Sequence, residues 1–292
     1  MKLGTRGSAL ARWQADWVRG RMATLGVTVE IVVIKTRGDA EVDRPLHELE
    51  GKGFFTKEIE DALLAGRIDV AVHSLKDLPT QLPAGLALAA VPARHDPRDA
   101  LVGGTGLGDL PQGARIGTSS LRRVTQVRYL RPDLRVVPLR GNVPTRVRKA
   151  LAGEGCDAAL LALAGLERLS LGRRAAPVHP LEVMPAPGQG ALGLEIRADD
   201  GPTRAALRPL EDAASARAVA AERAVLAALG GGCQAPVAAW VDGQRLFGRV
   251  TAPDGAVQLT ASAQIDPQRP ETAGETVARL LEAQGAASLL GR

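Results

Sequence analysis

Residues 54–74 read FFTKEIEDALLAGRIDVAVHS, a stretch in which a helical pattern runs directly into a strand-like one. The apolar side chains of its first part recur at helical spacing and predict an amphipathic helix. They are Phe55, Ile59, Ala62 and Leu63. Residues 68–74 predict a buried strand. Repeated alternation of helix and strand indicates a parallel or mixed sheet that is covered by helices.

The same alternation extends in both directions from this stretch. Residues 8–22 predict a helix with Ser8 as its N-cap, and the β-branched run 27–36 predicts a buried strand. A second α/β block follows, with strands at 114–120, 134–141 and 156–165 and helices at 121–130 and 143–155.

Two glycine- and proline-rich segments, 92–114 and 179–196, suit crossovers between domains. The first contains GGTGLG, which lacks the spacing of a dinucleotide-binding motif and is interpreted as a linker or loop. After the second, a long helix at 215–232, strands at 236–243, 244–252 and 257–265, and a helix at 275–290 predict a small α+β domain.

The composition is that of a globular protein, with 45% apolar and 24% charged residues in a chain of 292. Aromatic residues make up only 2%, which disfavours the base stacking of a single-stranded nucleic-acid binder. The net charge is +5 and the two cysteines do not form a disulfide framework. With no apolar run of signal-peptide or membrane-spanning length, the sequence predicts a soluble cytoplasmic protein.

Hydroxyl and cationic side chains recur where predicted strands end, which is where ligands bind in open α/β sheets, and at the start of the predicted helix near the N-terminus. They are Arg6, Ser8, Lys76, Thr118, Ser119, Ser120, Arg122, Arg123, Arg140 and Arg168. This recurrence predicts a cleft between two domains that holds a ligand with several negative charges. Phosphate, nucleic acid and polycarboxylate all remain open, as does a non-enzymatic anion-binding protein.

Two further residues stand apart from this cationic set. Asp77 could stabilise a transient cation, or could only pair with Lys76 or a nearby arginine. Cys233 follows three glycines after the long helix, which indicates exposure, whereas Cys156 reads as a small buried residue. The polar segment 39–53 fits either a lid or an ordinary surface loop.

Several motifs together resemble the porphobilinogen deaminase, or hydroxymethylbilane synthase, family. They are TRGSALA, HSLKDLP, GTSSLRR, LRGNVPTR, PGQGALG and GGCQAP, and they follow the family's order from about Leu3 to about Val237. The resemblance implies a transferase that joins four porphobilinogen molecules into 1-hydroxymethylbilane and releases four ammonia molecules. It also implies a dipyrromethane cofactor attached through a thioether to Cys233, and no metal.

The resemblance also implies roles for individual residues. Asp77 is the expected catalytic acid, and the acid-binding arginines are Arg6, Arg122, Arg123, Arg140, Arg146 and Arg168. Polar contacts are expected from Lys76, Ser8, Thr118, Ser119, Ser120 and Gln189, with Lys52 and Phe55 as lid candidates. The expected partners are porphobilinogen and the growing oligopyrrole, without nucleic acid or membrane. A monomer that hands its product to uroporphyrinogen-III synthase is expected.

The family fold implies an α/β protein of three domains. The first two are expected to be periplasmic-binding-protein-like, with mixed doubly wound sheets around a cleft, and the third to be a small α+β domain with an antiparallel sheet. The expected boundaries are 1–92 plus 191–209 for domain 1, 97–188 for domain 2, and 213–292 for the cofactor-bearing domain 3.

Overall fold

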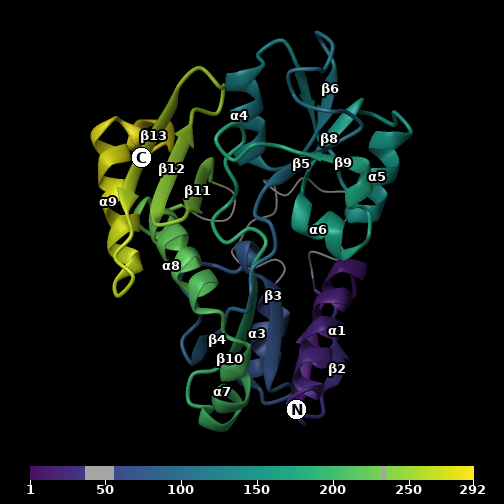
Figure 1. Cartoon of the computed structure of the whole chain (residues 1–292), viewed down its shortest axis with the longest axis vertical. Helices are drawn as coiled ribbons and strands as arrows, with labels where there is room; N and C mark the ends of the chain where they lie inside the picture. The colour runs from purple at the N-terminus through teal and green to yellow at the C-terminus, as the bar shows by residue number, and fades with distance from the viewer. Residues whose placement is uncertain (37–55, 232–234) are drawn as a thin grey trace. The chain divides into compact units, whose positions relative to one another are not determined.

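A computed structural model of the chain describes residues 1–36, 56–231 and 235–292. The chain divides into two compact units, and Figure 1 labels most of their helices and strands. Unit 1 comprises Met1–His95 and Ala191–Ala216, and unit 2 comprises Asp96–Gly190 and Arg217–Arg292. The chain therefore leaves unit 1, forms the first part of unit 2, returns to complete unit 1, and ends in unit 2.

Unit 1 contains a five-stranded sheet with the strand order β2-β1-β3-β10-β4. Its strands are β1 (Lys2–Thr5), β2 (Glu30–Val33), β3 (Val70–Ser74), β4 (Leu86–Ala90) and β10 (Leu192–Arg197). Strand β1 pairs in parallel with β2 and β3, whereas β10 runs antiparallel to β3 and β4. Strand β10, which the chain forms after it returns to unit 1, therefore lies between β3 and β4.

Helices cover both faces of this sheet. Helix α1 (Ala9–Ala23) packs on one face, with Val18 in the same apolar cluster as Val70 and Val72. Helix α3 (Lys57–Leu64) packs on the other, where Ala71 joins its cluster. The short helices α7 (Gly201–Leu207) and η4 (Arg208–Leu210) follow β10. Ser8 caps α1 as the sequence predicts, because its Oγ accepts a hydrogen bond from the Ala11 N–H at 3.3 Å.

Unit 2 contains a second five-stranded sheet with the order β7-β6-β8-β5-β9. Its strands are β5 (Asp99–Val102), β6 (Arg115–Gly117), β7 (Arg135–Val137), β8 (Ala158–Ala162) and β9 (Ala175–Pro177). Strand β6 is parallel to β7 and β8, and β5 is antiparallel to β8 and β9. The helices are α4 (Leu121–Leu130), α5 (Val143–Leu151), α6 (Leu163–Arg168) and η3 (Gly172–Arg174).

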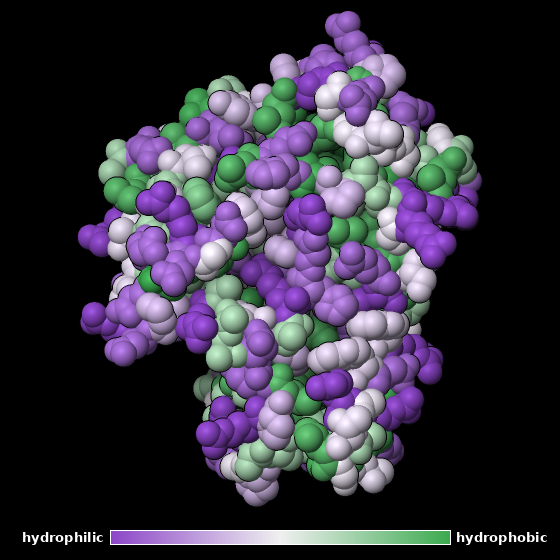
Figure 2. All heavy atoms as spheres, viewed as in Figure 1, coloured by the Kyte–Doolittle hydropathy of each residue, from purple (hydrophilic) through white to green (hydrophobic). Residues whose placement is uncertain are grey.

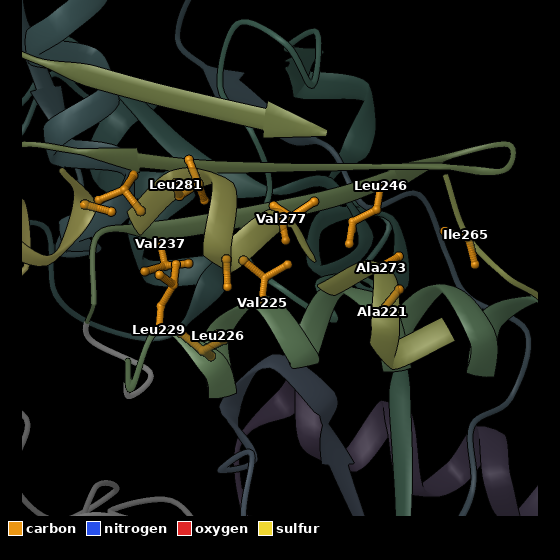
Figure 3. Packing of buried hydrophobic residues seen from close by; sticks show 14 residues of the cluster. Ala221, Val225, Leu226, Leu229, Val237, Leu246, Ile265, Ala273, Val277 and Leu281 are labelled. Atoms are coloured by element: carbon orange, nitrogen blue, oxygen red, sulfur yellow. The ribbon is translucent and has the colours of Figure 1, made fainter. Parts of the chain in front are cut away.

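A three-stranded antiparallel sheet completes unit 2, in the order β11-β12-β13. Its strands are β11 (Val237–Asp242), β12 (Arg245–Thr251) and β13 (Gln258–Gln264). The helices beside it are α8 (Ala213–Ala228), whose first turn belongs to unit 1, α9 (Pro270–Ala283) and α10 (Ala286–Leu289). Figure 3 shows the core where Val225 of α8, Val277 of α9 and Leu246 of β12 gather. All three side chains are fully buried.

These three sheets confirm the predicted fold class of two mixed α/β sheets and one small antiparallel sheet. The three domain boundaries stay a prediction, because the structure groups the second and third sheets in one compact unit. Figure 2 shows hydrophilic side chains interspersed with apolar ones over the face that it draws. No helix in the described part of the chain is long and apolar enough to cross a membrane.

The structure corrects three sequence expectations about local structure. Segment 92–114 is the predicted crossover, since the chain passes from unit 1 to unit 2 after His95, but it also contains the unpredicted strand β5, whose four residues are all buried. Glycines and prolines dominate the composition of this segment, so the short apolar run of β5 gives no clear strand pattern. The expected strand 156–165 ends at Ala162 and continues as helix α6. The last helix starts at Pro270 rather than 275 and stops before Gly285, whose φ of +99° favours glycine.

Two glycines in helices give a matched test of this packing. A Cβ on Gly274 of α9 would lie 2.5 Å from the carbonyl oxygen of Ala221 in α8, so the helices touch backbone to backbone there. We expect Gly274→Ala to lower the free energy of unfolding by about 1–3 kcal/mol, because the helices must separate. Gly20→Ala in α1, where nothing lies within 4 Å, should instead raise it by about 0.5–1 kcal/mol.

Urea unfolding of the two variants and the wild type measures both changes. Equal stability of Gly274→Ala and the wild type would contradict the close packing of α8 and α9.

Candidate functional site

In unit 1, four predicted site residues lie at the carboxyl ends of neighbouring strands. Arg6 and Ser8 follow β1, and Lys76 and Asp77 lie on the short 3₁₀ helix η2 (Leu75–Asp77) that follows β3. Strands β1 and β3 are parallel and adjacent. Their carboxyl ends therefore share one edge of the sheet, and all four side chains are half-buried there.

The turn that carries Lys76 and Asp77 is held by contacts of its neighbours. The backbone N–H of Leu75 donates to the carbonyl of Ala191 at 3.0 Å, which extends the pairing of β3 with β10. The Ser74 hydroxyl accepts a hydrogen bond from Gln14 Nε2 of α1 at 2.8 Å. Leu75 itself is fully buried. These contacts fix the direction in which the turn leaves the sheet.

In unit 2, a second set of predicted residues follows the parallel strands β6 and β7. Ser119 Oγ donates to the Leu139 carbonyl at 3.0 Å and lies 3.2 Å from the Leu139 N–H, which donates to it. Thr118 Oγ1 accepts from the N–H of Ser120 at 3.3 Å. The Ser119 contacts tie the loop after β6 to the end of β7, next to Arg140. The hydroxyls therefore shape this edge of the sheet.

Arg140 and Arg146 flank the start of α5 and are both half-buried. Asn142 caps the helix by accepting from the Thr145 N–H at 2.9 Å. Arg146 Nε donates to the Gly141 carbonyl at 2.7 Å, which holds its guanidinium over the first turn of the helix. Cations and backbone N–H groups at a helix start provide an environment that suits carboxylates.

Arg122 and Arg123 are both buried and converge on the carboxylate of Asp99. Arg122 Nη2 lies 2.8 Å from Asp99 Oδ2, and Arg123 forms two hydrogen bonds, Nη2 to Oδ1 at 2.7 Å and Nε to Oδ2 at 3.1 Å. Arg123 Nη1 donates to the Leu160 carbonyl at 3.1 Å. Arg123 therefore directs all three of its guanidinium nitrogens to groups within unit 2.

Gln189 joins the same network from the segment before β10. Its Nε2 donates to Asp99 Oδ1 and to the Pro97 carbonyl, both at 2.7 Å. Burial alone would raise the pKa of Asp99, but the guanidinium groups of Arg122 and Arg123 more than offset it and hold that pKa well below its ordinary value. Asp99 is thus a buried, charged centre that three predicted ligand-binding residues share.

Arg168 lies at the end of helix α6, not at a strand end as predicted. Its side chain is buried, and Nη2 donates to the Gly190 carbonyl at 2.7 Å. Burial lowers the pKa of Arg168 to about 10. Arg168 and Gln189 both hold the GQG segment at the point where the chain leaves unit 2.

The residues Lys52, Phe55 and Cys233 lie outside the described residues, so their predicted roles stay predictions. On either side of Cys233, α8 ends at Ala228 and β11 begins at Val237. Within the described ranges 1–36, 56–231 and 235–292, no group of three or more His, Cys, Asp or Glu side chains could hold a metal ion.

Sequence reasoning missed Asp99, the residue on which the arginines of the GTSSLRR motif converge. It lies in the segment that was interpreted as a linker, and no periodicity marks it. The available signal was chemical: two adjacent arginines that start a predicted helix with apolar neighbours need an acidic partner if they are buried.

Replacing Asp99 tests whether it is the partner on which this network depends. We expect Asp99→Asn to lower the free energy of unfolding at pH 7 by about 3–5 kcal/mol, because two guanidinium groups lose a buried charge. The folded pKa of Asp99 lies below its unfolded value, so its contribution is present above about pH 4 and is lost as the pH falls through the folded pKa. Urea unfolding at pH 7 and pH 3 measures both effects.

Asp133→Asn is the matched control, because Asp133 also pairs with an arginine, Arg131 at 2.7 Å, but stays in contact with solvent. Its loss should be much smaller. An Asp99→Asn variant as stable as Asp133→Asn would contradict the central role of Asp99.

Comparison with known proteins agrees with the motifs. Residues 1–205 match the family model "Porphobilinogen deaminase, dipyromethane cofactor binding domain", and residues 216–283 match "Porphobilinogen deaminase, C-terminal domain". The chain is 49% identical to the porphobilinogen deaminase of Syntrophotalea carbinolica over 99% of its length and 95% of the relative's. It is also 49% identical to that of Acidithiobacillus ferrooxidans, over 99% of the chain and 97% of the relative.

Among solved structures, the chain is similar to a putative methionine-binding lipoprotein from Bacillus subtilis, with a TM-score of 0.42 and 14% identity over 72% of this chain and 89% of the other. A nutrient binding protein from Burkholderia cenocepacia gives a TM-score of 0.42 and 14% identity over 71% and 90%. The family models and the near full-length relatives carry the assignment. The chain belongs to the porphobilinogen deaminase family, transferases of tetrapyrrole biosynthesis with a dipyrromethane cofactor.

Proposed function

We propose that this enzyme joins four porphobilinogen molecules head to tail into 1-hydroxymethylbilane, with release of four ammonia molecules, on a dipyrromethane bound to Cys233. The observation that carries the proposal is the place of Asp77. A carboxylate lies at the end of β3, on the same sheet edge as Arg6 and Ser8. An acid among cations suits a substrate that is anionic at its side chains and becomes cationic at its ring.

The donor set of the chain fits a dipyrromethane. Each pyrrole ring carries an acetate and a propionate, and guanidinium groups bind carboxylates with two parallel hydrogen bonds. Half-buried Arg140 and Arg146 offer such groups beside a helix start. Arg122 Nε is a buried donor without a partner among the described residues, which suits a further carboxylate oxygen. When bound, the dipyrromethane supplies the free pyrrole α-carbon to which substrate units are joined.

Asp77 acts on the ring nitrogens in this proposal. A carboxylate accepts hydrogen bonds from pyrrole N–H groups, and it stabilises the positive charge that develops on such a nitrogen as ammonia leaves a substrate unit. The stabilisation is effective because the group is fixed before the reaction, so no reorganisation is needed. The backbone contacts of the η2 turn provide that fixation.

The predicted cationic residues and Gln189 divide by burial in this proposal, with Arg122 between the two groups. Arg6, Lys76, Arg140 and Arg146 are half-buried and are proposed to bind acetate and propionate groups directly. Arg123, Arg168 and Gln189 are buried with internal partners and are proposed to shape the site around them. Arg122 combines an internal ion pair with one remaining donor.

An intact-mass measurement under denaturing conditions tests the attachment. The purified enzyme should be heavier than its sequence by one dipyrromethane, because a thioether survives unfolding. Cys233→Ser should have the bare sequence mass. Cys156→Ala is the matched control, since Cys156 is the other cysteine and is buried, and it should keep the added mass. A bare mass for wild-type protein that still forms tetrapyrrole would overturn the attachment.

Substitution of Asp77 tests its role in the reaction. We expect Asp77→Ala to lower kcat by about 10²-fold or more, the usual scale for loss of one fixed electrostatic group, while thermal unfolding stays unchanged. Asp77→Glu keeps a carboxylate in a displaced position and should fall between Asp77→Ala and the wild type. Near-normal turnover of Asp77→Ala, measured as tetrapyrrole formed per enzyme, would remove Asp77 from the mechanism.

A further inference from the structure

A cluster of buried titratable side chains lies in unit 1 under helix α3, and the proposed chemistry does not use it. The members are His73 of β3, Glu195 of β10 and Glu60 of α3. Glu195 is 0% exposed, and His73 and Glu60 are each 6% exposed. Burying ionisable groups is costly unless they are paired. The burial of these three side chains therefore needs a physical explanation.

Strand pairing explains how His73 and Glu195 meet. In the antiparallel pair, Gly193 lies opposite His73 and Glu195 lies opposite Ala71. Since side chains alternate between faces, His73 and Glu195 are diagonal neighbours on the face that α3 covers. His73 Nε2 lies 3.0 Å from Glu195 Oε2. The contact joins the C-terminal end of strand β3 to strand β10.

The end of β3 is thus held from both faces of the sheet. On the α1 face, Gln14 donates to Ser74, and on the α3 face, His73 contacts Glu195. Gly193 completes the arrangement, because a Cβ there would lie 2.7 Å from Leu75 Cδ1 and would displace that buried side chain. Each of these contacts acts within four residues of Lys76 and Asp77.

Glu60 is the third buried titratable side chain of this cluster. Burial raises its pKa, and the carboxylates of Glu195 and Asp61 add to the rise, whereas Thr56 and His73 oppose it. Oε1 of Glu60 and Oε1 of Glu195 are both buried without a partner among the described residues.

We infer that His73 and Glu195 form a buried clamp that positions the Lys76–Asp77 turn for the reaction. Both are positioning residues, since they act through the turn and touch no reacting atom. The inference rests on the proposed role of Asp77. A displacement of about 1 Å at a reacting group costs on the order of 10²-fold in rate, so a clamp at this point controls kcat more than substrate binding.

The decisive variant is the double substitution His73→Leu with Glu195→Leu. Replacing both partners of a buried polar contact by apolar residues of similar shape can be nearly neutral for stability, so the fold is retained while the clamp is removed. We expect kcat to fall at least about tenfold with KM within about twofold of the wild type. His73→Gln, whose amide can still donate to Glu195, should recover most of kcat relative to His73→Leu alone.

Amide hydrogen exchange gives a readout that does not depend on activity. The amides of Leu75 and Leu78 donate within and beside the turn, to Ala191 and Leu75 respectively. In the double variant they should exchange faster than in the wild type, while the amides of α1 stay protected. Asp61→Asn, an exposed carboxylate on the same helix as Glu60, is the control and should leave exchange and kcat unchanged.

Two results would overturn the clamp: unchanged kcat in the double variant, or faster exchange throughout unit 1 with a matching loss of thermal stability. A failure of the proposed function looks different. In that case Asp77→Ala stays active or the wild type forms no tetrapyrrole, while exchange at Leu75 and Leu78 still reports on the clamp.

Discussion

A charge that is removed from water must find an opposite charge or a full set of hydrogen bonds, and the arrangement of unit 2 depends on this constraint at Asp99. Its carboxylate is completely buried on strand β5. The side chains that reach it come from helix α4 and from the GQG segment. One carboxylate therefore ties together three parts of unit 2 that are far apart in sequence.

The same constraint acts where the third sheet meets the second. Arg249 of β12 is buried and donates to Gln126 of α4 at 2.9 Å and to the carbonyls of Leu181 and Glu182. Glu222 of α8 accepts from the N–H groups of Gly188 and Val241 at 2.8 and 3.1 Å. Fixed polar contacts of this kind make one compact unit of the two sheets. The helix that precedes Cys233 is thereby anchored to the GQG segment.

The proposed function requires groups that bind carboxylates and a group that stabilises developing positive charge. The structure separates the buried arginines that pair with Asp99, such as Arg123, from the half-buried ones near a helix start, such as Arg140 and Arg146. Sequence position could not make this distinction, because Arg122 and Arg140 both follow predicted strands. The distinction comes from the buried carboxylate of Asp99, which pairs with Arg122 and Arg123.

The sequence by itself determined the alternation of strands and helices, the Ser8 cap, the fold class and the family, because periodicity, capping and motifs are local. It also placed Lys76 and Asp77 at the end of a strand. Only the tertiary structure decided that β5 is a buried strand, that Asp99 joins Arg122, Arg123 and Gln189, and that β10 brings Glu195 to His73. Those partners are 23 to 122 residues apart, and no local pattern records which distant strands will pair.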